Sequence, residues 1–309
     1  MAKLPDVLHG LTVLPVPGHG AEDVLVDRGS VYTGTEDGSV FKVRSDGNRI
    51  DRIGRTDGRP LGLELLPDGR ILVCDARRGL LAMDQGGRCE ILADTVSGQR
   101  LLFCNNAAVA SNGDIYFTDS SRHHPVERWK AEFVEDTRSG RLLRRNAGGS
   151  VEVILDQLRF ANGVALSADE AYVAAAESTG RTVVRRWLKG ARTGQTDHLA
   201  VDLPGYPDNI SRGSDGLIWV TIASPTDPLL ERLMRLPVAL RRAVARLPEA
   251  LQPNPKRTAR VMAIDDMGTV VYDISCDASS FHMVTGVRED RGRVWLGSLL
   301  EHAVAYFDL

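Results

Sequence analysis

Apolar runs of strand length alternate with polar, glycine-containing turns along most of the chain. One unit recurs six times: a short apolar strand, a turn, a β-rich second strand, and a third strand with the pattern Gly-x-apolar-apolar. Turns such as PDGR at 67–70 and SDGL at 214–217 contain Asp-Gly, which favours tight hairpins. The second strands read SVYTGT, RILVCDA, DIYFTDSS, AYVAAAES, LIWVTIAS and RVWLGSLL.

A fourth strand is visible in several units, for example as CEILAD and VEVILD. Four antiparallel strands in each of six repeats predict an all-β fold, the six-bladed β-propeller. The last unit ends at the C-terminus on its third strand, so we expect the N-terminal LTVLPV at 11–16 to supply its fourth strand and close the ring. A two-sheet sandwich also has many short strands, but it does not require the same motif six times.

Two stretches break the repeat, at 121–140 and 225–257. Both fall between the second and third strands of their blades, so we interpret them as insertions within one domain that spans 1–309. The stretch 225–257 predicts helix, interrupted by prolines, because its apolar residues have a spacing of three to four. These residues are Leu229, Leu230, Leu233, Leu236, Leu240, Val244 and Leu247.

The first residue of each innermost strand is expected to point toward the same end of the central channel. Four of these six positions carry an oxygen donor: Glu22, Asn105, Asn162 and Asp208. The other two positions are Leu61 and Thr285. Carboxylate and amide oxygens without Cys or His suit one hard divalent cation, Ca²⁺ foremost, with Mg²⁺ and Mn²⁺ as alternatives. The competing interpretation is that such residues only cap strands and turns.

Composition narrows the class of protein. The chain has 309 residues, 43% of them hydrophobic, with a formal net charge of -3. This is the balance of an ordinary globular protein, and nothing in it suggests a nucleic-acid partner. The N-terminal segment lacks the apolar stretch of a signal peptide, so we expect a cytoplasmic protein. The four cysteines lie in apolar runs without CxxC spacing and are expected to be buried rather than to bind zinc or form disulfides.

Several segments resemble a known superfamily of calcium-dependent propellers, which includes senescence marker protein/gluconolactonases, paraoxonases and strictosidine synthase-like proteins. DIYFTDSS at 114–121, LRFANGVALSADEAYVAAAES at 158–178 and LPGYPDNI at 203–210 look like the strictosidine synthase-like branch, with adipocyte plasma membrane-associated protein. The resemblance implies that Glu22, Asn105, Asn162 and Asp208 are metal ligands, with Asp23 and Asn209 as supporting or additional ligands. Phe160, which opens the F-x-N-G motif, is then expected in the substrate pocket.

The chain departs from the catalytic positions of these relatives. Strictosidine synthase looks to carry a catalytic glutamate where this chain has Thr285, and a threonine is no base near neutral pH. The paraoxonase branch has a histidine where this chain has Leu61. Both residues are therefore expected to line the substrate pocket. The reaction most compatible with the residues that this chain has is hydrolysis of a lactone or ester, with the cation polarising the carbonyl.

A general base would still assist such a reaction. His123 and His124 follow FTDSS in a loop expected above the metal, and His282 lies three residues before Thr285. We take Asp208, His282 and His124 as candidate catalytic residues and place His123 in the pocket. Asp119 and Glu177 also end second strands on this face, but carboxylates there more often bind backbone amides.

The helical insertion is basic as well as apolar, and three roles are open to it. It is interpreted as a lid over the channel mouth, as a membrane-surface contact through 229–247, or as a dimer contact. A lid of this kind favours a small hydrophobic ester or lactone over a sugar lactone. The alternatives to a hydrolase are a strictosidine synthase-type condensing enzyme and a non-catalytic propeller with a structural metal. The sequence leaves the oligomeric state open.

Overall fold

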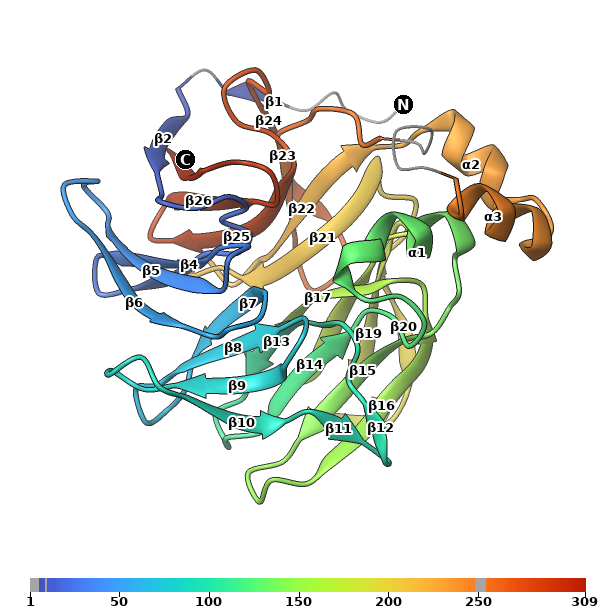
Figure 1. The fold of residues 1–309 in the computed structure, drawn as a ribbon, viewed down its shortest axis with the longest axis horizontal. Coiled ribbons are helices and arrows are strands. Elements are labelled where there is room, and N and C mark those ends of the chain that lie inside the picture. The colour runs from blue at the N-terminus through green and yellow to red at the C-terminus, as the bar shows by residue number, and fades with distance from the viewer. Residues whose placement is uncertain (1–5, 9, 248–253) are drawn as a thin grey trace.

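The structure is a computed structural model that describes residues 6–8, 10–247 and 254–309. Six of the sheets formed by the described strands stand around a ring, and each contains four antiparallel strands that make one blade (Figure 1). The predicted six-bladed β-propeller is therefore confirmed.

The first three blades follow the chain without exchange of strands. Blade 1 contains β3 (Leu25–Asp27), β4 (Ser30–Gly34), β5 (Ser39–Arg44) and β6 (Ile50–Arg55). Blade 2 contains β7 (Pro60–Leu65), β8 (Ile71–Asp75), β9 (Gly79–Met83) and β10 (Cys89–Ala93). Blade 3 contains β13 (Cys104–Val109), β14 (Ile115–Asp119), β15 (Gly140–Arg145) and β16 (Val151–Leu158). A small hairpin of β11 (Thr95–Val96) and β12 (Gln99–Arg100) joins blades 2 and 3.

The last three blades follow in chain order, and the sixth is completed by a strand from the N-terminal region. Blade 4 contains β17 (Ala161–Leu166), β18 (Tyr172–Glu177), β19 (Thr182–Trp187) and β20 (Thr196–Ala200). Blade 5 contains β21 (Gly205–Arg212), β22 (Ile218–Pro225), β23 (Arg260–Ile264) and β24 (Val270–Cys276). Blade 6 contains β25 (Val284–Asp290), β26 (Arg293–Ser298), β27 (Ala303–Asp308) and the N-terminal β2 (Thr12–Pro15).

Ring closure occurs as the sequence predicts. β2 pairs antiparallel with β27, from Thr12 opposite Tyr306 to Pro15 opposite Ala303. Blade 5 gains a strand that the repeat did not predict: β1 (Asp6–Leu8) pairs in parallel with β24 on the outer edge of this blade.

The repeated turns explain why the first two strands of each blade form hairpins. In blade 3, Asn112 Oδ1 accepts a hydrogen bond from the Asp114 amide, and Gly113 occupies the left-handed region with φ +84. In blade 5, Asp215 Oδ1 accepts in the same way from Leu217 N. The side chain of Asn or Asp holds the turn while glycine supplies the backbone conformation that other residues resist.

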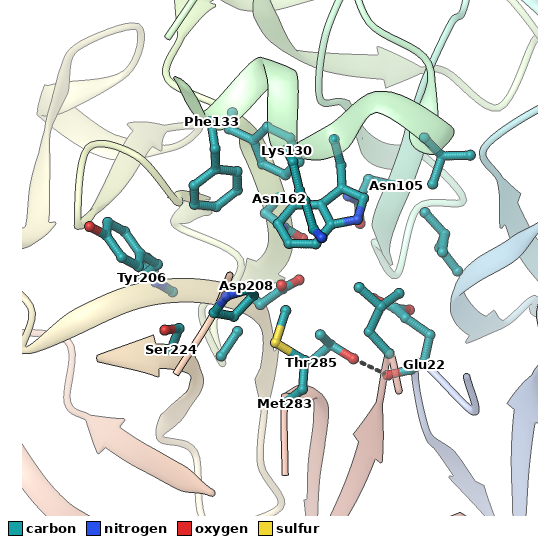
Figure 2. A pocket seen from close by; sticks show the side chains of 18 of the residues that line it. Glu22, Asn105, Lys130, Phe133, Asn162, Tyr206, Asp208, Ser224, Met283 and Thr285 are labelled. Atoms are coloured by element: carbon teal, nitrogen blue, oxygen red, sulfur yellow. Dashed lines mark hydrogen bonds between the residues drawn. The ribbon is translucent and has the colours of Figure 1, made fainter. Parts of the chain in front are cut away.

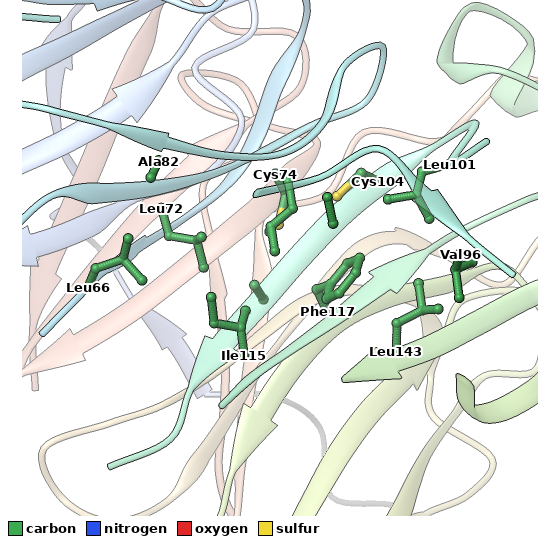
Figure 3. Close-up of a cluster of buried hydrophobic side chains, with 13 residues drawn as sticks. Leu66, Leu72, Cys74, Ala82, Val96, Leu101, Cys104, Ile115, Phe117 and Leu143 are labelled. Atoms are coloured by element: carbon green, nitrogen blue, oxygen red, sulfur yellow. The ribbon is translucent and has the colours of Figure 1, made fainter. Parts of the chain in front are cut away.

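The cores lie between neighbouring blades. In the example of Figure 3, Leu72 and Cys74 of blade 2 pack against Cys104, Phe117 and Leu143 of blade 3. Cys74 and Cys104 are fully buried, as predicted, whereas Cys89 and Cys276 are partly exposed, and all four are free thiols. Because each blade buries both of its faces, the central strands are almost uniformly apolar.

Both insertions contain helix. Residues 121–140, which carried no helical prediction, form the 3-10 turn η1 (Val126–Arg128) and α1 (Trp129–Glu135). The predicted helices of 225–257 are α2 (Pro228–Met234) and α3 (Val238–Ala245), while 248–253 of that prediction lies outside the described residues. A further 3-10 turn, η2 (Gly190–Arg192), precedes β20. In the described part of the chain, no helix is long and apolar enough to cross a membrane.

Candidate functional site

A β-bulge interrupts the innermost strand of five blades at the same repeat position. In blade 3, Cys104 pairs with Asp119 and Ala107 with Phe117, so the inner strand holds one extra residue between the two pairs. The same irregularity recurs in β7, β17, β21 and β25. A bulge redirects side chains that a regular strand would place on its faces. The bulges therefore aim the predicted site positions into the channel.

Each bulge contains two residues, which we call the site pair. In blade 1 the equivalent residues, Glu22 and Asp23, lie before β3 and are separated from it by Val24. The remaining pairs are Leu61-Gly62, Asn105-Asn106, Asn162-Gly163, Asp208-Asn209 and Thr285-Gly286. The second member is polar in blades 1, 3 and 5 and glycine in blades 2, 4 and 6.

This alternation has a steric cause. A Cβ on Gly163 would lie 2.0 Å from Ile210 N in the next inner strand, and a Cβ on Gly62 would lie 2.7 Å from Asn106 Cα. The polar members lie beside these glycines and join the blades. Asn106 Oδ1 accepts from Val164 N in blade 4, and Asp23 Oδ2 accepts from Leu63 N in blade 2. These hydrogen bonds of the second members tie blade 1 to blade 2 and blade 3 to blade 4 beside the first members.

Serine hydroxyls orient the two candidate asparagine ligands. Asn105 Nδ2 donates to Ser120 Oγ over 2.9 Å, and Asn162 Nδ2 donates to Ser178 Oγ over 3.3 Å. Ser120 and Ser178 directly follow equivalent strands, β14 and β18. With their nitrogens engaged, both asparagines direct their oxygens away from the serines.

Three of the four predicted donor residues keep a buried oxygen without a hydrogen-bond partner. These atoms are Glu22 Oε2, Asn105 Oδ1 and Asn162 Oδ1, and Asn209 Oδ1 behaves in the same way. Buried polar atoms normally find partners, because an unsatisfied one costs about 1–3 kcal/mol. Such atoms gathered around one channel mouth are what a cation site requires.

The electrostatics of the buried carboxylates also favour a cation site. Burial raises the pKa of Glu22 well above its usual value, and repulsion from Asp23 and Asp208 adds to this, while Arg59 opposes it. Burial also raises the pKa of Asp208 to about 7, partly opposed by the Asn162 amide. Carboxylates that are costly to ionise together become stable as anions beside a cation.

The donor set fits a hard divalent cation. Two carboxylates and two amide oxygens resemble the all-oxygen ligands of Ca²⁺. In the described part of the chain, no three side chains of His, Cys, Asp or Glu are grouped so that they could hold a metal by themselves. The candidate site is not such a group, because two of its four donors are asparagines. The structure brings the four donors to one pocket (Figure 2), while their role as ligands stays a prediction.

Above the donors the pocket is apolar. Phe160 meets Phe103 with ring centroids 5.5 Å apart and Phe133 at 4.9 Å, and Phe133 also contacts Trp129 and Tyr206. The predicted pocket residues Leu61, Phe160 and Thr285 all line this space, whose empty volume, open solvent included, is ≈ 890 Å³. The hydroxyl of Thr285 donates to the Glu22 carbonyl over 2.8 Å, so it fixes the backbone that carries a candidate donor.

The two insertions form the upper wall. Trp129, Lys130 and Phe133 of α1 and Leu230 of α2 line the pocket. Lys130 Nζ donates to Asn254 Oδ1 over 3.0 Å, which links the blade 3 insertion to the blade 5 insertion.

Buried polar contacts fix these helices in place. The buried Glu132 accepts from Ser121 Oγ and from Thr137 N, which ties α1 to both ends of its own loop. Asp227 caps α2 by accepting from Leu229 N and Leu230 N.

The structure does not bring the three predicted histidines to the pocket. His123 is exposed, and His124 is turned toward α1, with Nε2 3.3 Å from Glu135 Oε1, because Ser121 Oγ accepts from both backbone amides and folds the loop back. His282 contacts Glu301 through Nδ1 and Arg257 through Nε2. It is the next residue, Met283, that lines the pocket.

Asp119 and Glu177 take the structural role that the sequence favoured. Asp119 Oδ1 accepts from Phe103 N and Leu102 N, and Glu177 Oε1 accepts from Arg159 N. Three groups escaped the sequence argument: Asn106, the serine pair and the α1 aromatics. The sequence does carry a signal for Asn106: the residue that follows each predicted site position alternates between a polar residue and glycine from blade to blade.

Comparison with known proteins places the chain in a family. The strictosidine synthase family model matches residues 105–191, and the model of the strictosidine synthase-like N-terminal region matches 6–43. Strictosidine synthase-like protein 6 of Arabidopsis thaliana is 30% identical over 92% of this chain and 76% of its own length. The chain belongs to the strictosidine synthase-like family. Adipocyte plasma membrane-associated protein of Rattus norvegicus, 31% identical over 91% of this chain and 81% of its own length, is another relative.

Solved structures agree on the fold of this strictosidine synthase-like protein. A gluconolactonase from Xanthomonas campestris matches with a TM-score of 0.71 and 17% identity, over 97% of this chain and 89% of that one. Regucalcin from Agrobacterium tumefaciens, described as a calcium-binding protein, matches with a TM-score of 0.68 and 14% identity, over 99% and 95% of the two chains. At such identities the likeness establishes the shared propeller.

Proposed function

We propose that this protein is a metal-dependent hydrolase of hydrophobic lactones or esters, with Ca²⁺ as its cation. The observation that carries the proposal is the set of unpartnered buried oxygens on Glu22, Asn105 and Asn162, beside Asp208, at the floor of an apolar pocket. The calcium-binding and gluconolactonase neighbours support it by analogy of fold. A bound dication would supply Lewis-acid polarisation of the substrate carbonyl.

The apolar wall determines the class of substrate. Phe103, Trp129, Phe133 and Phe160 present ring faces and edges, which would bind an aryl or alkyl group and exclude water. Lys130 is held at the rim by Asn254. A sugar lactone would leave most of its hydroxyl groups unpaired against this wall. We therefore expect an ester or lactone with an apolar body.

Proton transfer falls to a carboxylate. Among the described residues that line the pocket there is no histidine, and the Tyr206 hydroxyl is already engaged with Glu231 and the Asp227 amide. We assign to the Asp208 carboxylate the acceptance of a proton from the attacking water and its return to the leaving oxygen. Thr285 offers no base near neutral pH, and its hydroxyl donates to the Glu22 carbonyl, which argues against a condensing enzyme of the strictosidine synthase type.

Turnover of a panel of substrates tests the proposal. Aryl esters, alkyl lactones and gluconolactone would be assayed with and without chelator, on the wild type and on Asp208→Ala, with the exposed turn residue Asp46→Ala as control. We expect faster turnover of apolar substrates than of gluconolactone, loss on chelation, recovery with Ca²⁺, and loss in Asp208→Ala alone. A folded, metal-loaded protein that turns over none of them would indicate a structural metal and contradict the proposal.

A further inference from the structure

The helical insertion has two apolar sides, of which the pocket uses one. On the inner side, Leu230, Leu233 and Ala245 are buried against α1 and Tyr206. On the outer side, Leu229 is 65% exposed and Leu240 53% exposed, and Leu236 and Val238 are also exposed. If the insertion served only as a lid over the pocket, apolar residues would be needed only on its inner side. We call the residues of the other side, together with the three exposed arginines of the same segment that are not paired with α1, the outer lid face: Leu229, Leu236, Val238, Leu240, Arg232, Arg235 and Arg246.

The outer lid face is strongly basic in a chain of net charge -3. Residues 228–247 contain five arginines and one acidic residue, Glu231. Glu231 accepts from the Tyr206 hydroxyl and is therefore turned toward the blade. Arg241 is buried and donates to the Glu135 carbonyl. Within the described part of the chain, no ion pair neutralises Arg232, Arg235 or Arg246.

The position of α2 and α3 in the molecule also leaves the outer lid face accessible. α2 and α3 lie at the periphery of the ring, while α1 lies between them and the centre (Figure 1). The outer lid face can therefore meet an extended surface without the blades intervening. Contact there would also bring the pocket rim, through Leu230 and Asp227, close to that surface.

We propose that the outer lid face binds an anionic lipid surface. Leucines on short amphipathic helices enter the boundary between headgroups and acyl chains, and neighbouring arginines reach the headgroup phosphates with their long side chains. A protein interface would also tolerate arginine, but it would be expected to concentrate aromatic residues and methionine at its centre. The outer lid face contains arginine and aliphatic residues throughout.

A second exposed apolar area serves as an internal comparison. Met267, in the turn before β24, is 86% exposed, and Val270 and Val271 of β24 are 47% and 49% exposed. Their neighbours Asp265 and Asp266 are acidic, so this area lacks the positive charge that an anionic membrane would attract.

Vesicle co-sedimentation of the full chain tests the inference. Vesicles of phosphatidylcholine alone would be compared with vesicles that also contain phosphatidylglycerol, at low and high salt. We expect binding only to the anionic vesicles and weakening by salt. Leu229→Ser/Leu240→Ser and Arg232→Gln/Arg235→Gln should each weaken binding by about tenfold or more, since each arginine near an anionic surface adds about one kcal/mol. The control Val270→Ser/Val271→Ser should bind as the wild type does.

Three outcomes would overturn the inference. They are failure of the wild type to bind anionic vesicles, equal binding by all variants, and a dimer in solution that the Leu229→Ser/Leu240→Ser change converts to monomer. The last result would mean that a second copy covers the face. Circular dichroism of each variant establishes that the propeller is intact, and the readout is independent of any hydrolytic activity.

Discussion

At the scale of single residues, the site depends on the hydrogen bond of each asparagine nitrogen, because this bond sets the direction of the amide oxygen. Asn105 and Asn162 each engage a nitrogen with a serine hydroxyl and keep an oxygen unpaired. Ser120 Oγ in turn donates to the Ala161 carbonyl over 2.7 Å, so its position is fixed by the next blade. Through Ser120, the backbone of one blade thus sets the direction of a candidate ligand in the neighbouring blade.

The change Ser120→Ala tests this orientation. Without the hydroxyl, the Asn105 amide can rotate, so we expect about tenfold weaker Ca²⁺ binding and a loss of about 1 kcal/mol in the free energy of unfolding. The control is Ser150→Ala, because Ser150 accepts from Asn146 Nδ2 in the same manner on an exposed turn. Titration calorimetry would measure the Ca²⁺ affinity of both variants. Unchanged affinity in Ser120→Ala would show that the serine does not orient the Asn105 amide.

The glycine of a site pair is tested by Gly163→Ala. The new Cβ would lie 2.0 Å from Ile210 N and 2.5 Å from the Asn209 carbonyl carbon, both backbone atoms that cannot move alone. We expect a loss of about 3 kcal/mol or more in the free energy of unfolding. Gly148→Ala, whose Cβ would meet only the Asn146 side chain at 3.3 Å, should change it by less than about 1 kcal/mol. Denaturant unfolding compares the two, and equal losses would contradict the steric argument.

At the scale of elements, the strands follow from the sequence and the helices only in part. The Asp-Gly and Asn-Gly turns recur at a constant place in the repeat, so strand order and the N-terminal closure could be predicted. The helix α1 could not, because its seven residues contain no apolar period long enough to recognise. It forms because tertiary contacts of Glu132 and Phe133 stabilise it.

The element-scale prediction concerns two adjacent leucines of α2. Leu230 is buried and lines the pocket, whereas Leu229 is exposed. We expect Leu230→Ala to destabilise the packing of α2 on α1 by about 2–3 kcal/mol and Leu229→Ala to cost less than about 0.5 kcal/mol. Hydrogen exchange of the α2 amides would report this local opening directly. Equal protection in the two variants would mean that the lid does not depend on its inner side.

The histidines show why a site residue can be placed on the correct loop and still be absent from the site. The repeat predicts which end of a strand faces the channel, so it placed Glu22, Asn105, Asn162 and Asp208 in one pocket. Loop side chains have no such rule. His124 is directed by Ser121 and Glu135, and these local contacts cannot be inferred from spacing alone.

At the scale of the whole molecule, the ring is held by one seam between the chain termini. β2 is the only described strand that completes blade 6 from the N-terminal side, through four residue pairs with β27. Val16 follows it into the core and donates its amide to the His302 carbonyl over 2.7 Å. Because the blades support one another around the ring, opening this seam affects all of them.

Two truncations separate the seam from the strand that precedes it. Removal of residues 1–10 deletes β1 and should lower the free energy of unfolding by only about 1 kcal/mol, because β1 adds a short outer edge. Removal of residues 1–16 deletes β2 as well and should cost roughly 3 kcal/mol or more and promote aggregation through the exposed edge of β27. Thermal unfolding and light scattering would compare them. Equal stability of the two truncations would contradict closure by β2.

The central claim is that the channel mouth binds one divalent cation through Glu22, Asn105, Asn162 and Asp208, and calorimetric titration of chelator-treated protein with Ca²⁺ tests it most directly. We predict saturable binding of one ion per chain in the wild type. In the folded double variant Glu22→Gln/Asp208→Asn, which keeps the shape of both side chains but removes both charges, we predict binding about 100-fold weaker. Absence of binding of Ca²⁺, Mg²⁺ and Mn²⁺ to the wild type, or unchanged binding in the double variant, would contradict the account.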